Sequence, residues 1–251
     1  MSSSCSVRQS QRSCRQVGRT GGVRTGRAVA CACLGLALAS RLLGAVSPSK
    51  QEFGEAVHTR ASIDRGAELF RSCAACHGSA GGGVASGLVP RIGGQLASVL
   101  QKQLTDYRHD RRWDSRMEVA SDQHHLADAQ AIADVTAFIS QLRPREPSGH
   151  GSGESLVHGA DSYASACARC HGGAAEGDAE HSIPSLAAQH YEYLRRQIYD
   201  AMDGRRPNFS QKHIRLLARL DPDDVAAICD YLSRLGAGDR PHRVGEPAPS
   251  K

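Results

Sequence analysis

The stretch "CAACH" at residues 73–77 recurs as "CARCH" at residues 167–171. In each copy a histidine directly follows two cysteines separated by two residues, which is the spacing of covalent c-type haem attachment. Two thiols about one helical turn apart can each bond a vinyl group of the porphyrin, and the histidine is then carried beneath the iron. A thioredoxin-type redox pair or a four-thiolate zinc site would not require the histidines. We therefore predict two covalently bound haems c, held by Cys73, Cys76, His77, Cys167, Cys170 and His171.

The sequence around the two motifs repeats with a shift of 94 residues. Without any gap, this shift also matches Pro90 with Pro184, Gln95 with Gln189, Leu100 with Leu194, Gln103 with Gln197 and Asp106 with Asp200. Two copies of one unit are therefore present. Apolar residues at helical spacing predict opening helices at 65–77 and 158–171 and closing helices at 129–142 and 222–235, with a Gly-rich loop and a middle helix between them. The predicted fold class is all-α.

Composition divides the chain into further segments. Residues 1–45 carry seven arginines and no acidic residue, and include an apolar run ending in Ala37 and Ala39, a pattern typical of a cleavage site. We predict a signal peptide, with an uncleaved anchor as the alternative, because a membrane-spanning helix needs about 20 apolar residues. The predicted organisation is a signal peptide at 1–45, a flexible segment at 46–60, domain 1 at 61–143, a linker rich in Pro, Gly and Ser at 144–157, domain 2 at 158–236 and a disordered tail at 237–251.

Removal of the predicted signal peptide changes the charge balance. Lys plus Arg falls from 31 to 24 against 26 Asp plus Glu, so the remaining chain is slightly acidic. Nucleic-acid binding needs a clustered basic face, and the sequence therefore predicts no nucleic-acid partner. A slightly acidic chain suits a basic docking surface on a protein partner.

Residues 61–235 resemble tandem class I cytochromes c, and among these the cytochrome c4 family of dihaem electron carriers. The two CxxCH motifs, the segments "VPRIGGQLASVLQKQL" (89–104) and "IPSLAAQHYEYLRRQI" (183–198) and the closing helices carry the resemblance. It implies two all-α domains, each wrapped around one haem and packed together about a pseudo-twofold axis. It also implies that Pro90 and Pro184 offer backbone carbonyls to the two proximal histidines. The opening and closing helices should touch at Gly66 with Phe138 and at Gly159 with Tyr231.

The resemblance places the sixth iron ligand, usually a methionine, between the middle and closing helices. In the first unit this segment is "RRWDSRMEVASDQHH" (111–125), and Met117 is the only methionine of the unit. We therefore expect His77 and Met117 as the ligands of the first haem. His124 and His125 are competitors, and a methionine can also serve simply to fill a gap in packing.

The second unit departs from the family pattern, because its segment "RRPNFSQKHIRLLARL" (205–220) contains no methionine. His213 stands at the family position of the ligand, so we expect a bis-histidine haem with His171. The alternatives are Met202 on the middle helix, Lys212 after loss of its proton, and a vacant position.

Two pairs of arginines recur in both copies, Arg111 with Arg112 and Arg205 with Arg206. Guanidinium groups are natural partners of carboxylates, so we expect Arg111 and Arg205 to bind haem propionates. A solvated helix end is the alternative for each of them.

These features predict an electron-transfer protein rather than an enzyme. Methionine raises the potential of a haem relative to bis-histidine ligation, so the two haems should differ in potential. We expect a periplasmic one-electron carrier between a quinol-oxidising complex or periplasmic dehydrogenase and a terminal oxidase or reductase, with peripheral association at a membrane complex left open. The alternative is a haem enzyme, or an electron-transfer subunit of a periplasmic dehydrogenase, for example in thiosulfate oxidation, with a labile sixth ligand on the second haem.

Overall fold

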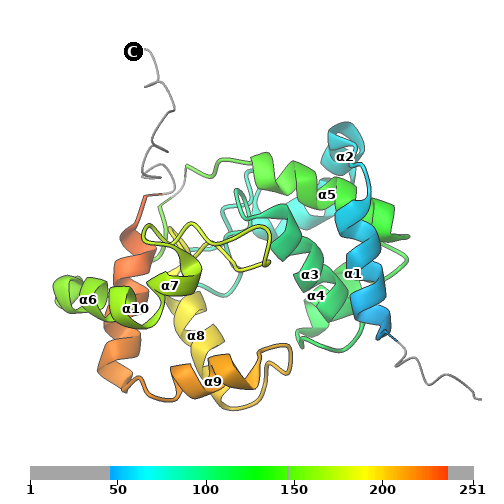
Figure 1. Ribbon diagram of the computed structural model, residues 1–251. Helices are drawn as coiled ribbons and strands as arrows, with labels where there is room; N and C mark the ends of the chain where they lie inside the picture. Colours follow the sequence, from blue (N-terminus) through cyan, green and yellow to red (C-terminus); the bar gives the residue numbers. More distant parts are fainter. Residues whose placement is uncertain (1–45, 146, 237–251) are drawn as a thin grey trace, which may run out of the picture. The chain divides into compact units, whose positions relative to one another are not determined.

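Helices provide the regular secondary structure of residues 46–145 and 147–236, which are the residues described in the computed structural model (Figure 1). The predicted signal peptide and tail lie outside these residues. No strand occurs within the described ranges, so the all-α prediction is confirmed. None of the helices described is long and apolar enough to cross a membrane. The helices are α1 (Pro48–His58), α2 (Ile63–His77), α3 (Ala97–Arg108), α4 (Ser115–Ala120), α5 (Ala129–Gln141), α6 (Leu156–Ala166), α7 (Ala168–His171), α8 (Tyr191–Met202), α9 (Gln211–Leu217) and α10 (Pro222–Arg234).

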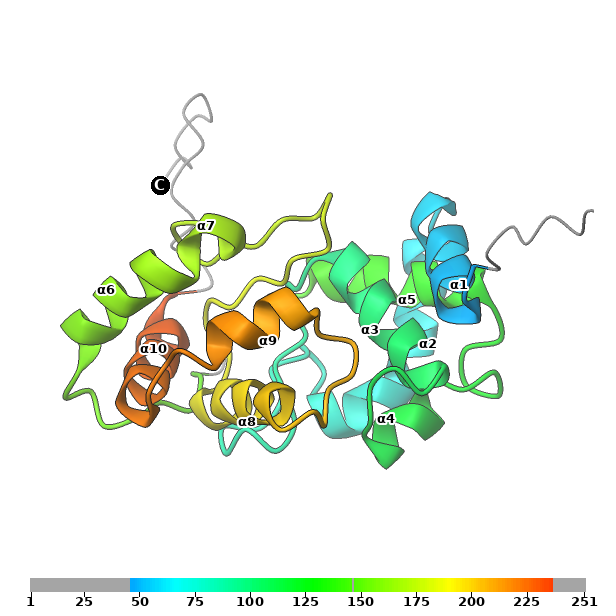
Figure 2. The same cartoon turned by 60° about the horizontal axis from the view of Figure 1, so that its bottom comes forward.

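In each half the opening helix packs across the closing helix, α2 on α5 and α6 on α10 (Figures 1 and 2). Glycines allow the close approach. A Cβ atom on Gly66 would overlap the carbonyl of Asp134 and lie 2.9 Å from the Cβ of Phe138. A Cβ on Gly159 would likewise lie 3.1 Å from the Cβ of Tyr231. The contacts implied by the family resemblance are therefore present in both halves.

Each half has its own apolar core. The closing helices that line these cores are capped at their N-termini. Asp128 accepts a hydrogen bond from the Ala131 amide at the start of α5 (2.8 Å), and Asp221 accepts one from the Asp224 amide at the start of α10 (2.8 Å). The first core is built from Ala56, Phe70, Leu100, Leu126, Ala131, Ile132, Val135 and Ile139. The second is built from Tyr163, Ala175, Leu194, Val225, Ile228, Cys229 and Leu232.

The segment before the first domain is helical, and the expectation of a flexible segment at 46–60 is wrong for α1. This helix packs on α3 and α5. Ala56 is fully buried in the first core, and Ser49 donates a hydrogen bond to Asp106 (3.2 Å). Glu52 forms an ion pair with Arg108 and a hydrogen bond with His109 (2.8 Å), at the end of the middle helix. These tertiary contacts, rather than local helix propensity, order the segment.

The two halves lie within one compact unit and exchange matching hydrogen bonds. The Gln95 side chain accepts from the Ser185 amide (3.0 Å) and donates to the Ser185 carbonyl (2.9 Å). The Gln189 side chain makes the same two bonds to the backbone of Arg91 (3.0 and 2.8 Å). Because the two glutamines occupy equivalent positions of the repeat, these reciprocal contacts are those expected of pseudo-twofold pairing.

The linker is packed on the second half. The Gly149 amide donates to His190 (3.1 Å), and the Gly149 carbonyl accepts from the Tyr191 amide (2.9 Å). The carboxylate of Asp230 accepts from the amides of Gly151 (2.9 Å) and Gly153 (2.7 Å). Its composition is that of a linker, but its backbone polar groups are bound to the second half.

Candidate functional site

The first CxxCH motif occupies the C-terminal end of α2. His77 is 5% exposed, and its Nδ1–H donates to the carbonyl of Pro90 (3.0 Å). This bond fixes the plane of the ring and leaves Nε2 as the nitrogen that can bind a metal. Burial lowers the pKa of His77, which favours the neutral imidazole that metal binding requires. Cys73 is half-buried and Cys76 exposed on the same helix end.

The second motif repeats this geometry at α7. His171 is 8% exposed and donates through Nδ1–H to the carbonyl of Pro184 (2.9 Å). Burial lowers its pKa as well. Cys167 is half-buried and Cys170 exposed. Both prolines thus make the contact that the resemblance implied. The residue after each proline is bound by a glutamine of the other half: Arg91 by Gln189, and Ser185 by Gln95.

His213 lies close to His171. It sits on α9, half-buried, and the centroids of the two imidazole rings are 6.2 Å apart with their planes inclined at 45°. Two imidazole nitrogens that each lie about 2 Å from one metal ion put their ring centres roughly 6 Å apart. Burial lowers the pKa of His213, and the charges of His171 and Arg206 act in the same direction. The centroid separation is therefore the one expected if both imidazoles bind a single metal ion.

The two other candidate ligands of the second haem, Lys212 and Met202, are not placed beside His171 as His213 is. Lys212 is exposed on α9. Met202 is the last residue of α8 and half-buried, but it is not part of the second apolar core, in contrast to Leu194 and Ile198 on the same helix. The structure brings neither of them into a described contact with His171.

In the first half, Met117 lies half-buried on α4. While burial lowers the pKa of His77, the charges of Arg116 and Asp114, at the start of α4, act on it in opposite directions. His124 and His125 are exposed, and both donate backbone amides to Asp122 (2.8 and 3.0 Å). This surface turn is the arrangement expected of a solvated histidine pair.

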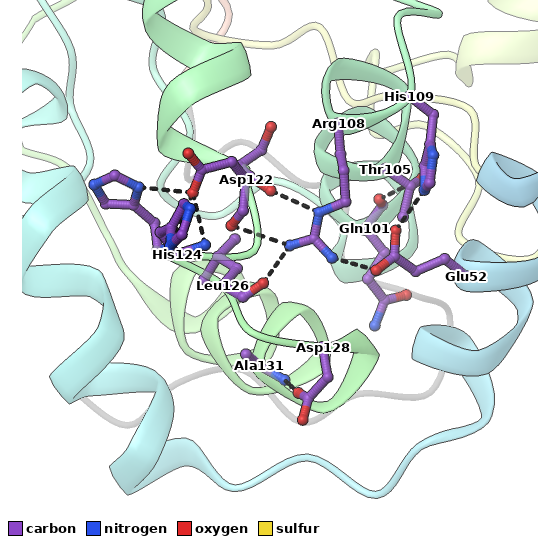
Figure 3. A network of polar contacts seen from close by, with 12 residues as sticks. Glu52, Gln101, Thr105, Arg108, His109, Asp122, His124, Leu126, Asp128 and Ala131 are labelled. Carbon is purple, nitrogen blue, oxygen red and sulfur yellow. Dashed lines mark hydrogen bonds and ion pairs between the residues drawn. The ribbon is translucent and has the colours of Figure 1, made fainter.

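Arg108 fixes the loop that follows α4 (Figure 3). Its side chain is 5% exposed and donates to the carbonyls of Ser121 (2.7 Å), Asp122 (3.4 Å) and Leu126. It also forms an ion pair with Glu52 of α1. Sequence reasoning missed this residue, because its partners are mainly backbone oxygens that carry no sequence pattern.

The arginine pairs divide between surface and interior. Arg111 is exposed, and Arg205 is exposed and paired with Asp200 and Asp203 (both 2.8 Å). Their binding to haem propionates stays a prediction. Arg112, by contrast, is 7% exposed, stacks on the ring of Tyr107 (4.6 Å), and donates to Gln103, Tyr193 and Gln197 (2.6 to 2.7 Å).

The arrangement of the cysteines and histidines distinguishes between a four-thiolate metal site and covalent haem attachment. No cluster of three or more His, Cys, Asp or Glu side chains that could hold a metal ion occurs among residues 46–145 and 147–236, so the cysteine pairs do not form a four-thiolate site. Each half instead presents one oriented, neutral histidine beside two cysteines on a helix end, and these groups fit a covalently bound haem.

Comparison with known families decides the identity of the fold. The family model "Cytochrome c" matches residues 63–143 and again residues 156–236. The chain belongs to the cytochrome c family. It is a dihaem cytochrome of the cytochrome c4 type with two covalently bound haems c, and it transfers electrons.

Curated relatives support the cytochrome c4 type. Cytochrome c4 of Pseudomonas aeruginosa is 30% identical over 171 residues, which cover 65% of this chain and 83% of that protein. Cytochrome c4 of Azotobacter vinelandii is 30% identical over 179 residues, or 65% of this chain and 84% of that protein. A thiosulfate dehydrogenase electron acceptor of Stutzerimonas stutzeri is 29% identical over 190 residues, covering 73% and 86%.

Solved structures share the fold. Reduced recombinant cytochrome c4 from Pseudomonas stutzeri superposes with a TM-score of 0.63 at 24% identity, covering 70% of this cytochrome and 100% of that chain. Thiosulfate dehydrogenase from Marichromatium purpuratum superposes with a TM-score of 0.57 at 26% identity, covering 75% of this cytochrome and 44% of that chain.

Proposed function

We propose that this cytochrome is a periplasmic one-electron carrier with two unequal haems, the first held by His77 and Met117 and the second by His171 and His213. The haems supply the one-electron chemistry. The observation that carries the proposal is the 6.2 Å separation of the His171 and His213 rings. Export is supported by the composition of residues 1–45.

The chain's own residues make the two sites unequal. A thioether favours ferrous iron relative to an imidazole, so ligation by Met117 raises the potential of the first haem above that of a bis-histidine haem. The first domain is then where the electron rests, and the second passes it on. Pro90 and Pro184 orient the proximal rings in both domains, so the difference arises on the distal side.

The test is near-infrared magnetic circular dichroism with low-temperature electron paramagnetic resonance on the oxidised protein. We expect one His/Met signal and one bis-His signal, with only the latter lost in His213→Ala. His181→Ala is the matched control, since His181 is an exposed histidine of the same domain paired with Asp178 (2.6 Å). Two His/Met signals would identify Met202 as the ligand and contradict the proposal.

A second candidate function follows from the relatives. Relatives named as thiosulfate dehydrogenase electron acceptors suggest that the electron donor is a dehydrogenase of small sulfur compounds. The cytochrome would then be its acceptor rather than the enzyme itself. We expect thiosulfate alone to leave the oxidised cytochrome unchanged and thiosulfate with such a dehydrogenase to reduce it. Reduction by thiosulfate alone, or carbon monoxide binding to the native reduced protein, would instead indicate an enzyme with a labile sixth ligand.

A further inference from the structure

The ring of His213 is stacked on a neighbouring aromatic side chain. The centroids of His213 and Phe209 are 4.8 Å apart, and their planes are inclined by only 20°. The guanidinium carbon of Arg206 lies 4.3 Å from the centre of the Phe209 ring. We call these three residues the ligand stack. An offset aromatic stack and a cation over a ring both restrict rotation of the side chains involved.

The segment that carries the ligand stack is bound to the first domain. Arg206 donates to Gln103 (3.2 Å), and Asn208 donates to Asp106 (3.0 Å). Gln103 and Asp106 are both on α3. Asp106 is 5% exposed and also accepts from Ser49 of α1 (3.2 Å), so its carboxylate is fixed before it meets the second domain.

The same segment also sets where α9 begins. Ser210 caps the helix by accepting a hydrogen bond from the amide of His213 itself (3.2 Å). The cap directly follows Phe209 and the anchored Asn208. A displacement of residues 206–209 would therefore move both the ring that stacks on His213 and the turn that carries it.

We propose that Phe209 is a positioning residue that holds the plane of the His213 imidazole, and that Asn208 links this position to Asp106 of the first domain. The inference rests on the proposed ligation of the second haem by His213. A methionine reaches iron through a flexible thioether, whereas an imidazole must present one nitrogen with a defined ring plane. The stack supplies that constraint, and its anchor makes ligation in one domain depend on contact with the other.

The test compares the bis-His signal and carbon monoxide binding in the holoprotein and its variants. In Phe209→Leu we expect a shifted or broadened bis-His resonance, and carbon monoxide binding to the reduced second haem, which the wild-type carrier should not show. Phe209→Tyr should behave like the wild type in both the bis-His resonance and carbon monoxide binding, because it retains the stacked ring. Asn208→Ala should reproduce the Leu variant, although Asn208 does not itself stack on the ligand.

Trp113→Leu is the matched control, since Trp113 is an aromatic residue 57% exposed in the first half. It should leave the bis-His resonance unchanged. If the wild type shows the bis-His signal, an unchanged resonance and no carbon monoxide binding in Phe209→Leu would overturn the positioning role alone. A wild type without a bis-His signal would overturn the ligation by His213 and this inference with it. A normal resonance in Asn208→Ala, beside a shifted one in Phe209→Leu, would reject the link to the first domain.

Discussion

The imidazole rings of His171 and His213 lie 6.2 Å apart although they belong to different elements, α7 and α9. Each ring is fixed by a different device. His171 is held through its Nδ1 by the carbonyl of Pro184, and His213 is stacked on Phe209. The bond to Pro184 leaves Nε2 of His171 to bind a metal, and the stack on Phe209 involves the face of the His213 ring rather than its nitrogens. A metal ion held by both rings would therefore have a reduction potential that depends on the residue at position 213.

Replacement of His213 by methionine tests this tuning. We expect His213→Met to raise the potential of the second haem by on the order of 0.1 V, within the roughly 0.8 V range that axial ligands span. The physical reason is the preference of a thioether for ferrous iron. A spectroelectrochemical titration measures the two potentials. Lys212→Met, at the exposed neighbouring position, should change neither, and an equal shift in both variants would speak against His213 as the ligand.

The Met117 loop provides a second prediction, through its anchor Arg108. Arg108→Leu leaves the carboxylate of Glu52 and the carbonyls of Ser121 and Leu126 without their buried cation. We expect a loss of about 3 kcal/mol in the free energy of unfolding, since removing one partner of a buried pair is strongly destabilising. The freed loop should also let carbon monoxide reach the reduced first haem.

Chemical unfolding and carbon monoxide titration measure the two effects. Arg195→Leu is the control, because the ion pair of Arg195 with Glu192 lies at the surface and should contribute less than about 1 kcal/mol. If Arg108→Leu cost no more than the control, the anchoring role of Arg108 would be wrong.

How far sequence reasoning reached depends on whether a feature is local. The CxxCH motifs combine all their chemistry within five residues, so haem attachment and the proximal histidines could be predicted. The glycine contacts followed from the family resemblance. The helix α1 could not be predicted, because its order comes from Ala56 in the core and from Glu52 with Arg108, contacts between distant segments. Nor could the inward member of the pair Arg111 and Arg112 be chosen, because both amides bond the carbonyl of Asp106 and only the turn decides which side chain is buried.

The glycine contact between α2 and α5 gives a third prediction. In Gly66→Ala the new Cβ would overlap the backbone of α5 at Asp134, which cannot move as a flexible side chain could. We expect a loss of about 3 kcal/mol in the free energy of unfolding. Denaturant unfolding followed by haem absorbance measures it. Gly54→Ala is the matched control, since it lies within α1 with open space around the new Cβ, and should stabilise by about 0.5–1 kcal/mol. A stable Gly66→Ala variant would mean that the two helices can separate without cost.

His190 gives the fourth prediction, a pH dependence of stability. It is 2% exposed at the boundary of the two halves, where its Nε2–H donates to the carbonyl of Gly82 (2.8 Å) and its Nδ1 accepts from the amide of Gly149 (3.1 Å). Both nitrogens are used by the neutral ring. Burial lowers the pKa of His190, the bond to Gly82 opposes this, and the charges of Arg91 and His150 lower the pKa further.

The sign of the effect follows from that depression. The unfolded chain takes up a proton at His190 as the pH falls below about 6.5, whereas the folded ring does so only at lower pH. The stability that the neutral ring contributes is therefore fully present above about pH 6.5 and is lost as the pH falls through the folded pKa. In His190→Gln we expect a smaller decrease in Tm between about pH 7.5 and about pH 5 than in the wild type. Thermal unfolding of both proteins across this range measures the difference.

His181→Gln controls for the titration of histidines in general. The side-chain hydrogen bond and charge of Asp178 raise the pKa of His181, so its contribution is present below about pH 6.5 and is lost as the pH rises through the folded pKa. Its removal should therefore change the pH dependence of Tm in the opposite sense, and only slightly, because the pair is exposed. If His190→Gln kept the pH dependence of the wild type, the neutral ring between Gly82 and Gly149 would not be what makes the folded state sensitive to acid.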